Sequence, residues 1–421
     1  MKKFAICIFL VLAVLQTGCK DKITEIFTAN SPTYMTYKDL RLAVKQTAAT
    51  ALVNPGKIYF KDQYIFIVEE MKGIHVFDNT NPSIPINLTY IELPGNVDIA
   101  IKGNMLYADS YVDMVAIDIA NLNAVKEVGR VQDVLPYTLP SYDTKYPLAQ
   151  IDEQKGVVTG WEVKEVKQVI NTTYYPIYRD WEFGKNADVS TGGGNSGVSP
   201  NGIGIGGSMA RFGIYLNTLF AIDNTTLHIF SITTPATPVF RKDFSAGWNI
   251  ETLFTVGDKM FLGSQSGMRI YDISIPNSPL YICDFWHMTG CDPVVISGNY
   301  AYITLRGGNT CGNNVNQLVV VSIADITKPV ELKTYPMEGP YGLGVDGNTL
   351  FICDGDAGLK VFDVADPFNI SKHVLAQFPD IQAYDVIPVK GLLIMIGDDG
   401  LYQYDYNNIK DIRLLSKIGL K

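Results

Sequence analysis

The stretch GNTLFICDGDAGLKVFDVADP, residues 347–367, decides the fold. It opens on a Gly-Asn turn and continues through an apolar run at 349–353. It then turns again at two glycines and enters a second apolar run that ends at Asp363. Short runs rich in β-branched and aromatic residues, separated by tight turns and followed by a proline, predict antiparallel β-strands rather than helices.

The second apolar run of this stretch, with its terminal Asp or Ser, occurs seven times along the chain. The terminal residues are Asp78, Asp118, Ser231, Asp272, Ser322, Asp363 and Asp405. Their spacings are 40, 113, 41, 50, 41 and 42 residues, so the unit is 40 to 42 residues long and two intervals carry insertions. Each unit holds four strand-like runs; in the sixth they lie at 343–345, 349–353, 358–364 and 373–378. A four-stranded unit of this length is typical of a β-propeller blade.

We therefore predict an all-β fold, a β-propeller of about seven four-stranded blades covering residues 54–421. One four-stranded sheet cannot cover its own apolar faces, whereas radial stacking buries both faces and ring closure protects the ends. The longest interval places an insertion at 132–208, between blades 2 and 3. An eighth, degenerate blade inside this insertion is the alternative.

The third strand of each unit resembles the LVIVD repeat, as in LVVVS at 318–322 and LKVFD at 359–363. The similarity runs from about Asn54 to Ile418 and includes NVDIA at 96–100 and LYADS at 106–110. As a whole, the chain resembles LVIVD-repeat lipoproteins of the Bacteroidetes type. This resemblance implies the propeller fold and implies neither catalytic residues nor a cofactor.

Residues 1–18 are typical of a signal peptide. Lys2 and Lys3 precede an apolar run at 4–15, which is too short to span a bilayer. The following Gly18-Cys19 resembles the lipobox of bacterial lipoproteins, although Gln16 stands where leucine is usual, three residues before the cysteine. The resemblance implies that Cys19 becomes the new N-terminus and carries lipid, including palmitate.

The residues after Cys19 indicate where in the cell envelope the mature protein is located. Lys20-Asp21-Lys22 partly resembles the surface-export signal of Bacteroidetes lipoproteins. We expect residues 19–53 to form a lipid-anchored tether with an N-terminal arm. The chain is then an outer membrane lipoprotein exposed at the cell surface, with the periplasmic face of that membrane as the alternative.

Composition limits the kinds of partner. With 47% hydrophobic and 18% charged residues, the chain is not mainly disordered. The net charge of −9 repels phosphate backbones, so we expect no nucleic acid partner. The membrane contact that we expect is the N-terminal lipid.

Four cysteines remain after the signal peptide and the lipidation site. Cys291 precedes the first strand of blade 5, and Cys311 lies between its second and third strands. These loops open on the same face of a propeller, so we predict a Cys291–Cys311 disulfide worth roughly 3 kcal/mol. Cys283 and Cys353 fall in strands of different blades and are expected to be unpaired small hydrophobic residues.

The segments outside the blades carry three further patterns. Alternation of apolar and charged residues at 157–170 predicts a long two-stranded excursion. Residues 191–208 are rich in glycine and predict a loop. They lack a lysine at the Walker spacing, so we do not expect a nucleotide site. Residues 37–46 have the pattern of a short helix.

Polar and aromatic residues lie where the first strands open onto the central channel. This candidate ligand-binding set contains Asp98, Trp248, Glu251, Trp286, His287, Asp292, Arg306, Tyr341, Tyr384 and Asp385. Carboxylates could bind cations or hydroxyl groups there, and the aromatic rings could stack on a ligand. The alternative is that these are the ordinary polar residues of a propeller mouth. The sequence does not say whether a metal binds.

Three functions fit this sequence. The first is a non-enzymatic binding or interaction module of the cell envelope, because a rigid ring with variable loops presents binding surfaces. Its ligand would be an extracellular protein, a peptide or a glycan. The second is a glycan-processing enzyme that uses the channel mouth, with Asp292 and Asp385 as the carboxylates. The third is a structural scaffold of the envelope. No catalytic motif distinguishes an enzyme here.

Overall fold

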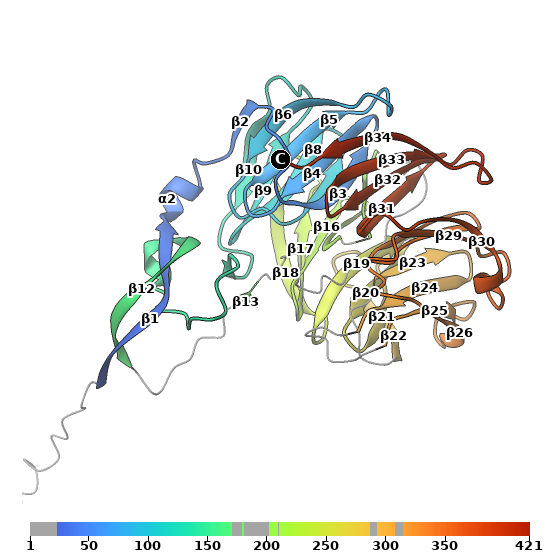
Figure 1. Ribbon diagram of the computed structural model, residues 1–421. Helices are drawn as coiled ribbons and strands as arrows, with labels where there is room; N and C mark the ends of the chain where they lie inside the picture. The colour runs from blue at the N-terminus through green and yellow to red at the C-terminus, as the bar shows by residue number, and fades with distance from the viewer. Residues whose placement is uncertain (1–22, 171–178, 181–201, 209, 287–292, 308–314) are drawn as a thin grey trace, which may run out of the picture.

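The computed structural model describes residues 23–170, 179–180, 202–208, 210–286, 293–307 and 315–421. It confirms the predicted all-β architecture: seven blades form a ring, and a separate lobe stands beside them (Figure 1). In every blade the strands follow one another in sequence order, each antiparallel to the last. The first strands of neighbouring blades contact one another, which places them innermost.

The strands of blades 1 to 4 are as follows. Blade 1 contains β3 (Pro55–Lys61), β4 (Tyr64–Glu69), β5 (Gly73–Asp78) and β6 (Ile86–Glu92); blade 2 contains β7 (Ile99–Lys102), β8 (Met105–Ser110), β9 (Asp113–Asp118) and β10 (Lys126–Val131). Blade 3 contains β15 (Phe212–Tyr215), β16 (Thr218–Ile222), β17 (Thr226–Ser231) and β18 (Val239–Ser245); blade 4 contains β19 (Ile250–Val256), β20 (Lys259–Ser264), β21 (Gly267–Asp272) and β22 (Leu280–Trp286).

Blades 5 to 7 complete the ring. Blade 5 contains β23 (Val294–Ser297), β24 (Tyr300–Leu305), β25 (Gln317–Ser322) and β26 (Val330–Pro336); blade 6 contains β27 (Leu343–Asp346), β28 (Thr349–Cys353), β29 (Leu359–Asp363) and β30 (Val374–Phe378), with a 3-10 turn η2 (Ile370–Lys372). Blade 7 contains β31 (Ala383–Val389), β32 (Leu392–Gly397), β33 (Gly400–Asp405) and β34 (Arg413–Gly419).

The core lies between blades rather than inside any one of them. Phe66 and Val76 of blade 1, for example, pack with Leu106 and Val115 of blade 2 in one buried cluster. Each middle strand is therefore covered on both faces, which explains why runs such as 65–68 are apolar at every position instead of alternating. Stacking of blades is what makes each four-stranded unit stable.

A carboxylate at the end of the second strand fixes the connection between blades. Asp109 accepts hydrogen bonds from the amides of Val97 and Asp98, at 2.8 and 3.0 Å. In blade 6, Asp354 bonds the amides at 338 and 339 in the same way. The Asp at the end of the second strand thus supplies acceptors for amides that the sheet leaves unpaired.

All four strands of blade 7 come from the C-terminal end of the chain, so no N-terminal strand completes this blade. Side chains instead join blade 7 to blade 1. Asn79 and Gln403 exchange two hydrogen bonds of 2.7 and 2.8 Å, although 324 positions separate them. The hydroxyl of Ser416 donates to the carbonyl of Pro82 at 2.7 Å. The two ends of the propeller chain are joined here by buried amides and by packing.

The N-terminal segment and the insertion pair to form the lobe. β1 (Ile23–Met35) runs antiparallel to β12 (Val157–Ile170) over the whole of its length. The predicted excursion at 157–170 is therefore one long strand, and its partner comes from the expected tether rather than from the insertion. No local pattern could show this, because the paired residues lie more than 120 positions apart.

The structure differs from the helix expected in the N-terminal segment, and it decides the alternative of an eighth blade for the described residues. The helix expected at 37–46 is a single turn, α2 (Tyr37–Leu40); the chain then forms β2 (Lys45–Ala48), which adds to the outer edge of blade 1 beside β6. The described part of the insertion forms no eighth blade. It contributes a 3-10 turn, β12 and short strands: η1 (Glu153–Lys155), β11 (Thr138–Leu139), β13 (Arg179–Asp180) and β14 (Ile205–Gly206).

Candidate functional site

The end of the insertion lies inside the ring. β14 pairs antiparallel with β3, the innermost strand of blade 1, and Ile203 bridges to Lys102 of blade 2. The Ser208 hydroxyl then reaches blades 6 and 7, because it accepts from the amide of Leu343 at 3.1 Å and donates to Asp385. We call residues 202–208 and 210–212 the inner segment; its last residue, Phe212, begins β15. The segment contacts the innermost strands of blades 1 and 2 and bonds residues of blades 6 and 7.

Glycine allows the inner segment to lie this close to the blades. A Cβ on Gly204 would stand 2.2 Å from the ring of Tyr59, and one on Gly207 would stand 1.9 Å from Asp385 Oδ2. Both distances are too short for any side chain. The glycine-rich stretch predicted as a loop therefore ends in residues that are held against the channel wall.

Two of the predicted mouth residues bind the inner segment. Asp98 Oδ2 accepts from Lys57 Nζ at 3.0 Å, from the amide of Phe212 at 3.1 Å and from the amide of Arg211. Lys57 and Asp98 are both buried, so this is an ion pair inside the protein. Burial lowers the pKa of Lys57, and the charge of Asp98 partly offsets that effect.

Asp385 is also buried, with 1% of its surface exposed. Its Oδ1 accepts from the amides of Ser208 and Val386, each at 2.9 Å. Burial raises the pKa of Asp385 to about 6, although the bonds from Ser208 and the charge of Lys57 oppose the shift. This carboxylate is bonded to the protein itself and is not open to a substrate in this conformation.

Three other predicted residues come together beside the mouth. The Arg306 guanidinium lies 3.7 Å from the centre of the Tyr341 ring, which packs edge-on against Tyr384 at 5.0 Å. The hydroxyl of Tyr384 lies 3.4 Å from Asp398 Oδ1, and burial raises the pKa of that tyrosine. Cation–π contact and edge-to-face packing make this a rigid cluster at the junction of blades 5, 6 and 7.

The two remaining described aromatics are exposed. We call the side of the ring that carries the connections from one blade to the next the crossover face; these connections include 246–249 and 337–342. Trp248 lies in the first of them with 79% of its surface exposed, and Trp286, the last residue of β22, is 65% exposed. Glu251 follows Trp248 closely and accepts from Gln265 at 2.9 Å.

Arg269 connects the backbones that carry these two tryptophans. Its Nη1 donates to the carbonyl of Ala246 at 2.9 Å, and its Nε lies 3.4 Å from Asp284. Ala246 and Asp284 each precede one of the tryptophans by two residues. The bond to Ala246 and the pairing of Trp286 with Gly267 in the sheet hold the backbone near both exposed rings, which reduces the entropy lost when a partner binds.

Several predicted residues lie outside the described parts of the chain. They are Cys19, His287, Cys291, Asp292 and Cys311. The expected Cys291–Cys311 disulfide and the role of Asp292 remain predictions. Cys283 and Cys353 are free, as expected; Cys353 is buried, and burial raises its pKa. No group of three or more metal-ligating side chains occurs among the residues that the structure describes.

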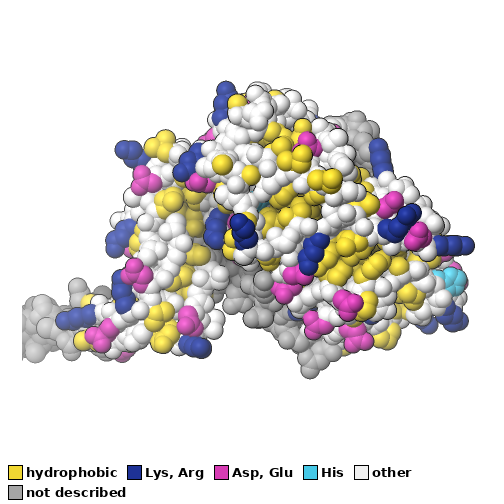
Figure 2. All heavy atoms as spheres, turned by 45° about the horizontal axis from the view of Figure 1, so that its top comes forward, with side chains coloured by type: hydrophobic (Ala, Val, Ile, Leu, Met, Phe, Trp, Pro, Cys, Tyr) yellow, Lys and Arg dark blue, Asp and Glu magenta, His cyan; other side chains and the backbone are white. Residues whose placement is uncertain are grey.

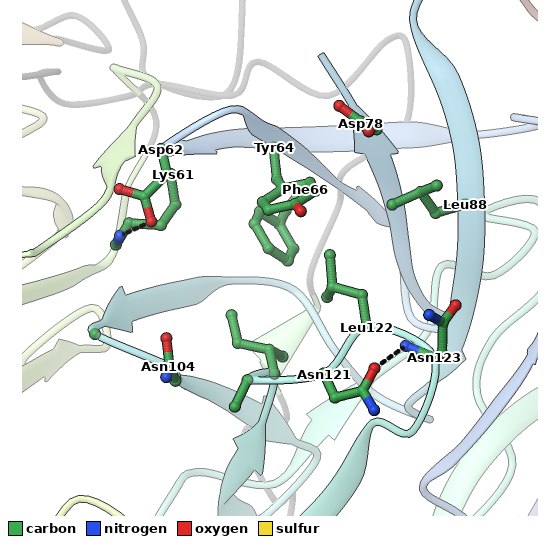
Figure 3. A pocket seen from close by; sticks show the side chains of 13 residues that line it. Lys61, Asp62, Tyr64, Phe66, Asp78, Leu88, Asn104, Asn121, Leu122 and Asn123 are labelled. Atoms are coloured by element: carbon green, nitrogen blue, oxygen red, sulfur yellow. Dashed lines mark hydrogen bonds and ion pairs between the residues drawn. The ribbon is translucent and has the colours of Figure 1, made fainter. Parts of the chain in front are cut away.

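The face opposite the crossover face holds a groove between blades 1 and 2, about 410 Å³ in volume (Figure 3). Tyr64 and Phe66 of blade 1 point into it, and Leu122 of blade 2 lies across from them. Asn104 and Asn121 stand at its rim. Sequence analysis did not identify this groove, because turns with the same pattern occur in every blade.

The histidines of the repeat have structural partners. His75 lies 3.1 Å from Glu69, and His228 lies 2.7 Å from Asp243 and 3.3 Å from Asp223. In blade 6, Lys360 bonds Asp354 from the same position of the third strand. A basic side chain at this position of the third strand therefore pairs with the acidic residue that ends the second strand. These pairs lie within one blade, so the role of the two histidines is structural.

We expect stability to fall as the pH rises through the pKa of His228. Burial disfavours the charged ring, but hydrogen bonds to Asp223 and Asp243 outweigh burial, so the pKa is raised. The stabilisation is then complete below the unfolded pKa of about 6.5 and is lost as the pH rises through the folded pKa. Urea unfolding of wild type and His228→Gln from about pH 5 to about pH 9 measures the difference. The control is His373→Gln, because His373 is exposed. The expectation is contradicted if the free energy of unfolding of wild type minus that of His228→Gln does not become smaller as the pH rises.

The comparisons with known proteins agree with this fold. Residues 95–133, 291–336 and 342–372 match the family model of the LVIVD repeat, so the chain contains LVIVD repeats. Among solved structures, the periplasmic gluconolactonase PpgL of Pseudomonas aeruginosa is similar with a TM-score of 0.51 and 10% identity, over 87% of this chain and 97% of that one. A Lactobacillus plantarum protein is similar with a TM-score of 0.52 and 12% identity, over 87% and 96%. At these identities the likeness shows the fold alone. No curated protein sequence matches the chain significantly.

Proposed function

We propose that this chain is a non-enzymatic binding module: a lipoprotein attached through Cys19 to the outer membrane, exposed at the cell surface, and binding an extracellular protein or glycan through its crossover face. The signal-like N-terminus and the lipobox-like Gly18-Cys19 support the attachment. A repeat propeller supports the binding role, because such rings present loops from a rigid frame. In the described part of the chain, no helix is long and apolar enough to span a membrane.

The observation that carries this proposal is the exposure of Trp248 and Trp286. An exposed indole ring does not gain the free energy that burial of its apolar surface would release. Tryptophan is enriched among the hot-spot residues of protein interfaces. The channel interior supports binding less well, because the inner segment lies against the channel wall and buries Asp98 and Asp385 there. The crossover face around blade 4 is therefore the binding surface that we assign.

The binding test uses the full-length protein with Trp248 and Trp286 both replaced by alanine. Partners are captured from cell-envelope extracts and, in parallel, on a glycan array. If each ring contributes like an interface hot spot, Kd should rise about 30-fold for each substitution. Phe368→Ala is the matched control, because Phe368 is 54% exposed but lies between the third and fourth strands of blade 6, on the opposite face. Equal binding by the double variant and the control would refute the assignment.

The location is tested separately by adding protease to intact cells that express wild type or Cys19→Ala. Digestion of the wild-type protein on intact cells would support surface exposure. Full protection of an anchored protein would place it on the periplasmic side, and partners would then be sought among envelope-assembly proteins.

A further inference from the structure

The lobe formed by β1 and β12 is built as a ribbon that leaves the ring. Figure 1 shows it extending away from the blades, with the first residue of β1 at its far end. β1 contains 13 residues. At about 3.4 Å for each residue of an antiparallel strand, the ribbon is about 40 Å long.

The end of the ribbon near the ring is fixed. Arg41, just after α2, bonds Asp113 of blade 2 at 3.0 Å and Asp133 at 2.8 Å. Leu40 and Val157 are fully buried in a small core together with Tyr111 of blade 2. This half of the lobe therefore moves with blade 2 rather than swinging on a linker.

The middle of the ribbon is braced by the insertion. Asn30 is 1% exposed, and its side-chain amide donates to the carbonyls of Asp143 and Tyr146 at 2.9 and 2.7 Å. The Trp161 indole donates to the carbonyl of Pro140 at 2.9 Å. These bonds stiffen the ribbon up to about its midpoint.

From its middle to its tip, the ribbon carries three apolar side chains that the described residues cover only in part. Ile26 is 61% exposed, Val163 46% and Val169 43%. The register places these three on one face of the ribbon, which also carries Lys167, the partner of Ile26, and Glu165, the partner of Thr28. Figure 2 shows hydrophobic side chains among charged ones along this lobe. A two-stranded ribbon is marginally stable in water on its own, so exposed isoleucine and valine side chains near its tip favour contact with a surface that covers them.

The length of the chain beyond β1 identifies that surface. Only three residues separate Cys19 from Ile23. Four Cα–Cα steps reach at most about 14 Å, so a lipid on Cys19 would bring the tip of the ribbon to the bilayer that holds the lipid. Valine and isoleucine then enter the interface, while a long lysine such as Lys167 keeps its charge in water.

We propose that the ribbon is a spacer between the membrane and the propeller. Its tip, around Ile26 and Val169, inserts into the lipid surface, and the stiff remainder of the ribbon holds the propeller away from the bilayer. This inference rests on the proposed lipid attachment at Cys19. The ring would then face its partners at a distance set by the ribbon, beyond the headgroup layer.

The test is tryptophan depth measured in vesicles of phosphatidylcholine with brominated acyl chains. Full-length acylated protein carries Ile26→Trp or Thr24→Trp at the tip, or Thr159→Trp near the ring as the matched control. Wild-type emission provides the baseline for the native tryptophans. We expect the added emission at 26 and 24 to shift to the blue and to be quenched by bromine, whereas the emission added at 159 is unaffected.

Flotation of wild type and Cys19→Ala with the same vesicles separates the two proposals. If wild type floats, Cys19→Ala does not, and tip emission is unquenched, the anchor stands and the spacer is overturned. Equal quenching at 26 and 159 would mean that the ribbon lies flat, which also overturns it. A blue shift without vesicles that grows with protein concentration would show a second copy covering the tip. If wild type does not float, the lipid attachment itself fails.

Discussion

Replacing Asp98 by alanine should lower the free energy of unfolding by about 3–5 kcal/mol, the cost expected when a buried charge loses its partner. Lys57 Nζ, which lies 3.0 Å from Asp98 in a buried site, would lose this ion pair. The amides of Arg211 and Phe212 would lose their acceptor at the same time. Urea unfolding followed by circular dichroism measures the change.

A double variant shows whether the charge is the cause. Lys57→Met together with Asp98→Ala removes both members of the pair, so the remaining cost should be smaller than that of Asp98→Ala alone. Asp98→Asn keeps an acceptor for the two amides but removes the negative charge, and its stability should fall between wild type and Asp98→Ala. Additive losses in the double variant would rule out the ion pair as the source of the effect.

Gly207→Ala should destabilise the protein by about 3 kcal/mol through overpacking and should release the inner segment. The new Cβ would stand 1.9 Å from Asp385 Oδ2 and 2.8 Å from Asp385 Cγ. Asp385 cannot move aside easily, because its other oxygen is held by Ser208 and Val386. One of the two must move, and we expect the inner segment to do so, because Asp385 lies within the strand β31.

Urea unfolding gives the stability of Gly207→Ala, and trypsin gives the position of the inner segment. Cleavage after Arg211 should be faster in the variant than in wild type, because Arg211 is held beside Asp98 only while the segment is in place. Gly339→Ala is the matched control, since no atom lies within 4 Å of a Cβ at that position. If Arg211 is cleaved at the same rate in both glycine variants, the segment does not depend on this close contact.

The repeat predicted the ring because the information for each blade is local. The spacing of terminal residues such as Asp78 and Asp118 gave the unit length, and the apolar runs gave the four strands. In unit six, the expected strand at 349–353 is β28 without change of bounds. Burial on both faces makes such runs continuous, so they stand out from the polar turns on either side.

The candidate site was less predictable because it depends on contacts between distant residues. Asp98 directly precedes β7 and Asp385 lies in β31, but their pattern does not show that Ser208 and Arg211 would bind them. Glycine-rich sequence has no periodicity, so residues 202–208 looked like a loop. β1 and β12 were missed as partners for the same reason: each is an edge strand whose complement is far away in the sequence.

The position of the inner segment also determines the order in which the molecule assembles. Gly207 bonds Ile58, which precedes it, whereas Ser208 bonds Leu343 and Asp385, which are made 135 and 177 residues later. A chain that emerges from its N-terminus can lay this segment on blades 1 and 2 while blades 6 and 7 are still absent. The last blades then dock around a strand that is already seated, and the native topology needs no threading step. A chain cut after residue 212 should accordingly reassemble only if both halves fold together, because blades 1 and 2 and the inner segment lie on one half and the blades that enclose them lie on the other.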